Sequence, residues 1–216
     1  FVIHTGSPVS MPWIKSCPAI LQTWFPGQEF GNALAEILFG KESPSGKLPT
    51  TYPKKLSDTP AYSSYPGKNL QMDYKEKLLV GYKWYDKKKI EPLFPFGHGL
   101  SYSKFKLKKV SVTKKKHEIK IKVKLKNIGD FSTFETVQCY LERKAVKAET
   151  PKKKLVDFKK LKVAENKSKK LTLKVSKRDL SEWDVKKSKW EIAKGDYIIH
   201  VGTSVKDISI TEEIKI

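Results

Sequence analysis

The strongest constraint on the fold is a strict alternation of apolar and lysine residues that follows Glu118 and runs to position 126. Every second residue there is Ile, Val or Leu, and the residues between them are lysines. Because a β-strand points successive side chains to opposite faces, this period of two predicts a strand with one face in a core and the other in water.

The region 104–216 repeats such short strand patterns between turn signals and shows almost no helical periodicity. Short antiparallel strands with alternating faces fit an immunoglobulin-like or fibronectin type III-like sandwich. The sequence lacks the Cys-Trp-Cys spacing of antibody domains, which favours the fibronectin-like form. Besides 118–126, the predicted strands are 136–142, 171–175, 197–202 and 208–216.

Residues 1–62 alternate strand and helix signals instead. Apolar runs at 1–5 and 19–24 end at Gly and Pro residues and are typical of buried parallel strands. Between 28 and 39 the apolar positions follow one helix face, and Gly40 stands at its end. Two strands and one helix cannot close a sheet between helices, so we expect the C-terminal part of an α/β sandwich domain. The predicted fold class is therefore an α/β fragment followed by an all-β immunoglobulin/fibronectin type III-like sandwich.

Residues 63–103 are expected to form an ordered connector between these two parts. The stretch from about 43 to 102 is rich in Pro, Gly, Tyr and Ser, and its many aromatic residues argue against a flexible linker. We expect it to wrap over the neighbouring domains. The later segment 152–162 interleaves apolar residues with lysines and is expected to be a solvated strand or turn.

The formal net charge of +21 raises the question of an anionic partner. Of 44 basic residues only Arg143 and Arg178 are arginine, the residue that grips phosphate and bases with a planar fork. The lysines fall where a solvated strand face is expected, so we predict a lysine-biased surface and no nucleic-acid partner. An anion-binding protein, with acidic polysaccharide or nucleic acid as its ligand, is the competing interpretation.

No run of about 18 apolar residues occurs, so no membrane partner is expected. The chain begins at Phe1, which already lies in a predicted strand, and we expect its natural start to lie upstream. A signal peptide would lie there too, and the localisation is left open.

Neither the cysteines nor the histidines predict a metal or cofactor site. Cys17 and Cys139 are far apart, and Cys139 shares a predicted strand face with Val137 and Leu141, which indicates a core thiol. The four histidines are scattered along the chain: His4, His98, His117 and His200.

Five segments of the chain stand out as motifs: HTGSPVSMPW (4–13), WFPGQEFGNALAEILFG (24–40), PSGKLPTTYP (44–53), VGYKWYD (80–86) and EPLFPFGHGLSY (91–102). In this order and spacing they resemble the glycoside hydrolase family 3 enzymes, most closely the three-domain β-glucosidases. Two further motifs, NIGD and KGDYIIHVGTS, look like the turn and closing strands of that family's fibronectin-like domain.

The resemblance implies a retaining enzyme that uses two carboxyl groups about 5 to 5.5 Å apart. In that family the nucleophile is an Asp in a Ser-Asp-Trp context, and the acid/base of this subgroup is a Glu in a Glu-Gly-x-Asp-Arg context. Here the only Ser-Asp pair, Ser57-Asp58, is followed by Thr59, and the chain has no Glu-Gly. We therefore expect no catalytic residue in this chain, no activity of the chain alone, no cofactor, and a partner N-terminal catalytic domain or chain.

What the resemblance implies for the whole protein is hydrolysis of terminal non-reducing β-D-glucosyl residues of a β-linked glucoside or oligosaccharide. A β-xylosidase of the same family and a non-catalytic polysaccharide- or protein-binding fibronectin-like module are the alternatives. The module would need a surface row of aromatic residues, for which Trp183 and Trp190 are the candidates.

Two residues of the matching motifs are open to more than one interpretation. Trp13 is the candidate substrate-binding residue, at an outer sugar subsite, whereas packing is the more common role of an indole beside a proline such as Pro12. His98, between two glycines, could hydrogen-bond across a domain interface or reach the rim of the pocket, and we expect the interface. Glu76 is followed by Lys77 where relatives often have Gly, which is a departure from the family pattern.

Overall fold

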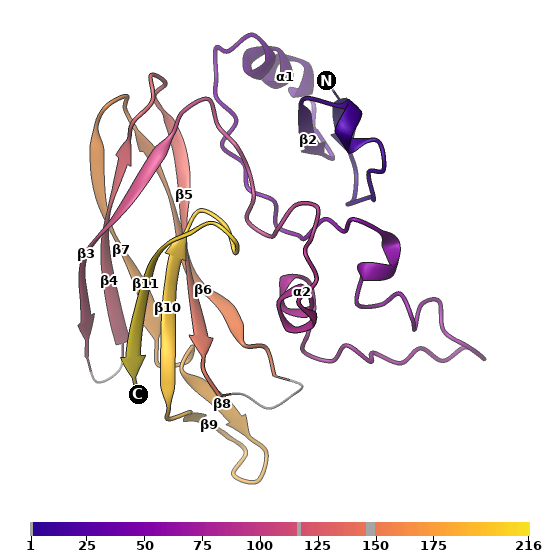
Figure 1. Ribbon diagram of the computed structural model, residues 1–216, viewed down its shortest axis with the longest axis vertical. Helices are drawn as coiled ribbons and strands as arrows, with labels where there is room; N and C mark the ends of the chain where they lie inside the picture. Colours follow the sequence, from indigo (N-terminus) through magenta and orange to yellow (C-terminus); the bar gives the residue numbers. More distant parts are fainter. Residues whose placement is uncertain (1, 116–117, 146–149) are drawn as a thin grey trace.

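The alternating segment forms β4 (Glu118–Asn127), the central strand of a three-stranded antiparallel sheet in the order β3-β4-β7. The computed structural model describes residues 2–115, 118–145 and 150–216. A four-stranded antiparallel sheet, in the order β11-β10-β5-β6, packs against the first to form a sandwich (Figure 1). The other sandwich strands are β3 (Phe105–Lys114), β5 (Thr133–Arg143), β6 (Lys153–Val163), β7 (Ser168–Ser176), β10 (Asp196–Gly202) and β11 (Ile208–Lys215).

The core of the sandwich lies between the two sheets and is built from the apolar half of each alternating strand. Ile121, Val123 and Leu125 of β4 are fully buried, and they share one cluster with Val137 and Cys139 of β5. Removing such aliphatic side chains from water stabilises the fold by about 1.5–3 kcal/mol each. The predicted sandwich and all five of its predicted strands are confirmed, and the segment predicted as a solvated strand or turn forms β6.

A small α/β unit precedes the sandwich. Strands β1 (Val2–Thr5) and β2 (Ile20–Trp24) pair in parallel, and helix α1 (Phe30–Leu38) follows them. These elements confirm the predicted strands and helix over their described residues, and Phe1 lies outside them. The expected burial is wrong for this chain, because no residue of β1, β2 or α1 is fully buried. A parallel pair needs cover on both faces, and α1 does not supply it.

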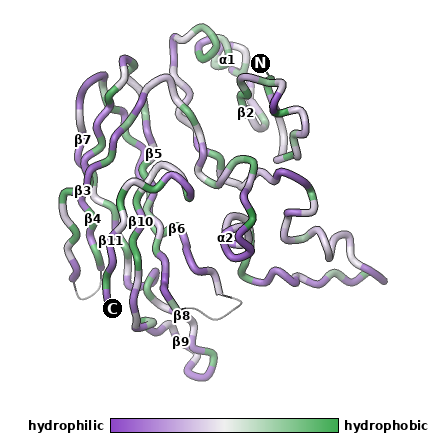
Figure 2. The backbone as a smooth tube through the Cα atoms, viewed as in Figure 1, coloured by the Kyte–Doolittle hydropathy of each residue, from purple (hydrophilic) through white to green (hydrophobic). Residues whose placement is uncertain are grey.

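Part of the connector packs on the outer face of the four-stranded sheet, whereas the loop before helix α2 (Tyr82–Lys88) extends away from the sandwich (Figures 1 and 2). The sequence did not predict α2, because seven residues are too few to show a helical period. Tyr82 of α2 packs with the fully buried Tyr140 of β5, with ring centroids 6.0 Å apart. Tyr82 and Phe96 of this stretch thus pack against the outer face of the four-stranded sheet, whereas the boundaries 63–103 of the connector stay a prediction.

A short hairpin of β8 (Ser181–Asp184) and β9 (Lys189–Ile192) extends from one end of the sandwich. No helix in the described part of the chain is long and apolar enough to cross a membrane.

The two cysteines differ in burial, and this difference allows a test of the sandwich core. Burial in the core raises the pKa of the Cys139 thiol to about 12, so it forms almost no thiolate, whereas Cys17 is half-buried and donates to the Ala19 carbonyl oxygen. We predict that a thiol reagent at pH 8 modifies one cysteine in the native protein and two in denaturant. Cys17→Ser should abolish the native reaction, and modification of Cys139 without unfolding would contradict the core.

Candidate functional site

The loop between β1 and β2 carries Trp13, the residue predicted to contact sugar. It begins at Gly6, whose φ of +83° makes the turn, at the carboxyl end of a parallel strand, where α/β domains place their ligands. Trp13 precedes a short 3-10 turn (Ile14–Ser16), and its carbonyl oxygen accepts a hydrogen bond from the Ser16 amide at 2.9 Å. Since 41% of the Trp13 surface is exposed, the indole is accessible. Its contact with substrate stays a prediction.

The base of this loop is fixed by partly buried hydrogen bonds that join it to Gln22 of β2 and to Tyr52. The Tyr52 hydroxyl donates to Gln22 Oε1 at 2.7 Å, and Gln22 Nε2 donates to the Gly6 carbonyl oxygen at 3.1 Å. The Tyr52 ring is almost fully buried and meets His4 edge-on, with centroids 6.4 Å apart. The start of the Trp13 loop is therefore tied to the body of the protein.

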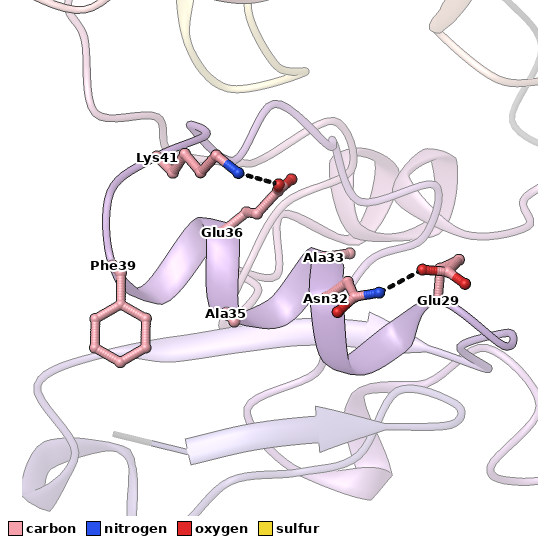
Figure 3. A pocket seen from close by; sticks show the side chains of 7 residues that line it. All are labelled: Glu29, Asn32, Ala33, Ala35, Glu36, Phe39 and Lys41. Carbon is pink, nitrogen blue, oxygen red and sulfur yellow. Dashed lines mark hydrogen bonds and ion pairs between the residues drawn. The ribbon is translucent and has the colours of Figure 1, made fainter.

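A hollow on α1 brings two carboxylates near each other (Figure 3). It has a volume of about 630 Å³ and is lined by Glu29, Asn32, Ala33, Ala35, Glu36, Phe39 and Lys41. A second hollow, at the β8–β9 hairpin, is lined by Glu182, Asp184 and Glu191, and each of these three carboxylates pairs with a basic side chain.

Glu29 and Glu36 do not form a catalytic pair. They lie seven residues apart on one helix, about 10 Å along its axis, which exceeds the separations that either mechanism of glycoside hydrolysis uses. Each carboxylate is also engaged, because Glu29 accepts from Asn32 at 2.6 Å and Glu36 pairs with Lys41 at 2.9 Å. In Figure 3 the two side chains point in different directions. The hollow is an uncovered helix face with small and aromatic residues.

The described residues contain no cluster of three His, Cys, Asp or Glu side chains suited to a metal ion. His117 lies outside the described residues. Glu76 is buried, and its Oε2 atom accepts no hydrogen bond from the part of the chain that the structure describes. The sequence marked Glu76 only as a departure from a family pattern, and its burial carried no sequence signal.

The contact between the α/β unit, the connector and β5 contains a buried ion pair that sequence reasoning missed. Lys47 Nζ lies 2.8 Å from Glu135 Oε1, and their side chains are only 13% and 8% exposed. Lys47 also donates to the Gly99 carbonyl oxygen at 2.7 Å, and the Thr136 amide donates to Glu135 at 2.7 Å. The two residues are 88 positions apart in sequence, so neither pattern nor spacing links them.

His98 lies in this same contact, as the interface interpretation expects. Its ring stacks on Phe94 with centroids 5.3 Å apart, and its carbonyl oxygen accepts from the Leu48 amide at 2.8 Å. Burial lowers the pKa of His98, and the charge of Lys47 lowers it further. The imidazole is therefore neutral at pH 7 and suits a packing role.

Trp183 and Trp190 face each other across the β8–β9 hairpin, with centroids 5.7 Å apart. The Arg178 guanidinium covers one face of Trp190 at 3.3 Å, and the two indoles are 49% and 43% exposed. They form one packed pair and not the row of aromatics that a polysaccharide-binding module would need.

The buried ion pair generates a stability prediction. Lys47→Met leaves the Glu135 carboxylate buried without its cation, so we expect a loss of about 3 kcal/mol in the free energy of unfolding, measured by urea denaturation. Lys41→Met is the control, because the Lys41–Glu36 pair is exposed to solvent and its loss should change the free energy of unfolding little. Equal small effects of the two substitutions would show that Lys47 does not anchor the interface.

Comparison with known proteins identifies two family models along the chain. Residues 1–102 match the glycosyl hydrolase family 3 C-terminal domain, and residues 135–205 match a fibronectin type III-like domain. Thermostable beta-glucosidase B of Acetivibrio thermocellus is 41% identical over 100% of this chain. Beta-glucosidase BoGH3A of Bacteroides ovatus is 39% identical over 96% of it. An exo-alpha-(1->6)-L-arabinopyranosidase of Bifidobacterium breve is 36% identical over 97%.

Solved structures give the same result. A GH3 beta-glucosidase from Bifidobacterium adolescentis superposes on 100% of the chain with a TM-score of 0.95 and 34% identity, and this match covers 32% of that protein. The beta-glucosidase of Kluyveromyces marxianus in complex with glucose gives a TM-score of 0.94 and 34% identity over 99% of the chain. The chain spans 29% of the length of the first two relatives and 28% of the arabinopyranosidase.

Proposed function

The chain belongs to glycosyl hydrolase family 3 and matches the C-terminal region of its β-glucosidases, and on this premise we propose the following function. It is the C-terminal portion of a retaining β-glucosidase that hydrolyses terminal non-reducing β-D-glucosyl residues of a β-linked glucoside or oligosaccharide. Both catalytic carboxylates belong to an N-terminal catalytic region, and the C-terminal portion supports and lines the active site.

The observation that carries the proposal is the uneven distribution of exposed apolar surface. Of twenty-one exposed large apolar or aromatic side chains among the described residues, fifteen lie in residues 1–102, although the sandwich is the larger part. Phe25 and Phe39 expose 87% and 89% of their surface, and no residue of α1 is buried. Exposed apolar surface of this extent marks an interaction site. An N-terminal region would supply the cover that β1, β2 and α1 lack.

The chemistry of retaining hydrolysis also supports placing the catalytic carboxylates in an N-terminal region and a supporting role in this chain. Retaining hydrolysis needs one carboxylate as nucleophile and a second carboxyl as acid and then base, close enough to act on one glycosidic bond. Glu29 and Glu36 are too far apart and too well paired for these roles. The chain's own contribution is to position Trp13 beside the site and to hold the α/β unit rigid through Tyr52 and Lys47.

Sugar specificity is set by the part that this chain does not supply. The same C-terminal region is similar to beta-glucosidases and to an arabinopyranosidase at comparable identity. The choice of glucose as the substrate therefore rests on the number of beta-glucosidases among the relatives, and not on a residue of this chain.

The direct test is complementation. We predict that the purified chain releases no p-nitrophenol from an aryl β-glucoside. Activity should appear when the chain is fused behind the N-terminal region of the Acetivibrio thermocellus enzyme in place of its own C-terminal region. The matched control is the same fusion with the N-terminal nucleophile replaced by Asn. Hydrolysis by the purified chain alone would contradict the proposal.

Trp13 is tested in that fusion. If its indole stacks on the outer sugar, Trp13→Ala should raise KM for a disaccharide by roughly two- to tenfold, the range of a lost aromatic contact, with little change in kcat. Trp13→Phe should retain most of the affinity. A lower melting temperature with an unchanged KM would assign Trp13 to packing.

A further inference from the structure

The outward face of the β3-β4-β7 sheet carries lysines directly opposite one another. Lys108 of β3 pairs with Lys124 of β4, and Lys124 pairs with Lys170 of β7, so one row across all three strands is entirely lysine. Lys106 opposes Lys126, and Lys120 opposes Lys174. The lysine face is defined by eight residues: Lys106, Lys108, Lys120, Lys122, Lys124, Lys126, Lys170 and Lys174.

Acidic residues are nearly missing from this face. The whole chain has 44 basic and 23 acidic residues, whereas the described part of the lysine face has eight lysines and one carboxylate, that of Glu118. Glu118 pairs with Lys120 at 2.9 Å, and none of the other seven lysines has a carboxylate within 4.0 Å among the described residues. Lysines elsewhere vary: Lys109 and Lys144 pair with Glu212 and Glu213, whereas Lys160 and Lys162 of β6 pair with no carboxylate of the described residues. What distinguishes the lysine face is that its lysines stand directly opposite one another across strands, which no other described strand pair shows.

This arrangement is unfavourable for the isolated sheet. Like charges directly opposite each other destabilise a strand pair, and Cβ atoms at such positions lie about 5 Å apart. Neighbouring ammonium groups thus fall within the Debye length of about 8 Å at physiological ionic strength and repel as a group. The register cannot shift to separate them, because a slip of one residue would expose Ile121 and Val123. A bound polyanion would remove this repulsion.

The other side of the sandwich is occupied, because the connector covers the outer face of β5 (Figure 1). The lysine face lies on the opposite side, where hydrophilic and hydrophobic positions interchange along β3 and β4 (Figure 2). We propose that the lysine face binds an extended anionic polysaccharide whose carboxylates lie across the rows of lysines.

The composition of the face favours a polysaccharide over a nucleic acid. Proteins that bind single-stranded nucleic acid stack the bases on aromatic side chains, and no aromatic residue stands among the outward positions of this sheet. Arginine, which grips phosphate with two parallel hydrogen bonds, is also lacking there, since Arg143 and Arg178 lie outside the three strands. The lysine face offers rows of ammonium groups on a flat sheet. Such a surface suits a polysaccharide with regularly spaced carboxylates better than a nucleic acid, whose bases need aromatic partners.

The test measures binding of the purified chain to polygalacturonate by affinity electrophoresis over a range of NaCl concentrations. The variant K108Q/K124Q/K170Q removes the all-lysine row, and K186Q/K189Q/K194Q removes three exposed lysines near the β8–β9 hairpin as the charge-matched control. We expect the native chain to bind polygalacturonate and not neutral dextran. The row variant should lower the slope of log affinity against log salt by about two to three, and the control should lower it by less than about one.

Thermal unfolding separates this result from misfolding. The row variant should melt no lower than the native chain without ligand, because it loses repulsion. Polygalacturonate should raise the melting temperature of the native chain and of the control variant more than that of the row variant. Equal losses of binding in both variants, or no binding by the native chain, would overturn the proposal. Tighter binding to duplex DNA than to polygalacturonate of equal charge concentration would also overturn it and assign the face to nucleic acid. None of these results depends on glycosidase activity.

Discussion

The burial of β5 on both of its faces is the constraint on which the rest of the structure depends. One face, with Val137 and Cys139, closes the sandwich core, and the other lies under the connector. Gln138 joins the connector to the sandwich, because its side-chain amide donates to the carbonyl oxygen of Gly97 in the connector at 3.2 Å and to that of Thr203, just after β10, at 2.6 Å. A buried polar network of this kind is stable only when its members are paired, so it fixes one position of the connector on the sheet.

The same constraint explains which parts of the fold the sequence predicted. The strands of the β3-β4-β7 sheet have one face in water, and their alternation of apolar residues with lysine could be recognised directly. In β5 Tyr140 is as fully buried as Cys139, so both faces of the strand are covered. Its prediction rested on the strand pattern between turn signals, in which Val137, Cys139 and Leu141 share one face, and that pattern did not reveal the burial of the other face. The family resemblance supplied the order of the domains, which local patterns alone do not contain.

The parts that the sequence could not predict depend on contacts between distant segments. Lys47 and Glu135 read as two ordinary charges until the fold brings them together in a buried pair. Helix α2 is short, and it is held by Tyr82, whose hydroxyl accepts a hydrogen bond from the Leu155 amide at 2.8 Å. For the candidate site, the sequence named Trp13 and the lack of the catalytic motifs. The hydrogen bond of Glu29 with Asn32 and the ion pair of Glu36 with Lys41 required coordinates.

The contrast between the two halves of the chain indicates how a fibronectin-like domain contributes to a glycosidase. The sandwich buries its own core, whereas the α/β unit leaves α1 uncovered and is held to the sandwich through the Lys47–Glu135 pair. An element with so little burial of its own has low local stability, and its loops fluctuate unless a rigid neighbour restrains them. The buried contacts of β5 provide that restraint on one side, and an N-terminal region would provide it on the other. The Trp13 loop, which lies between them, would then keep the fixed geometry that recognition of a sugar ring requires.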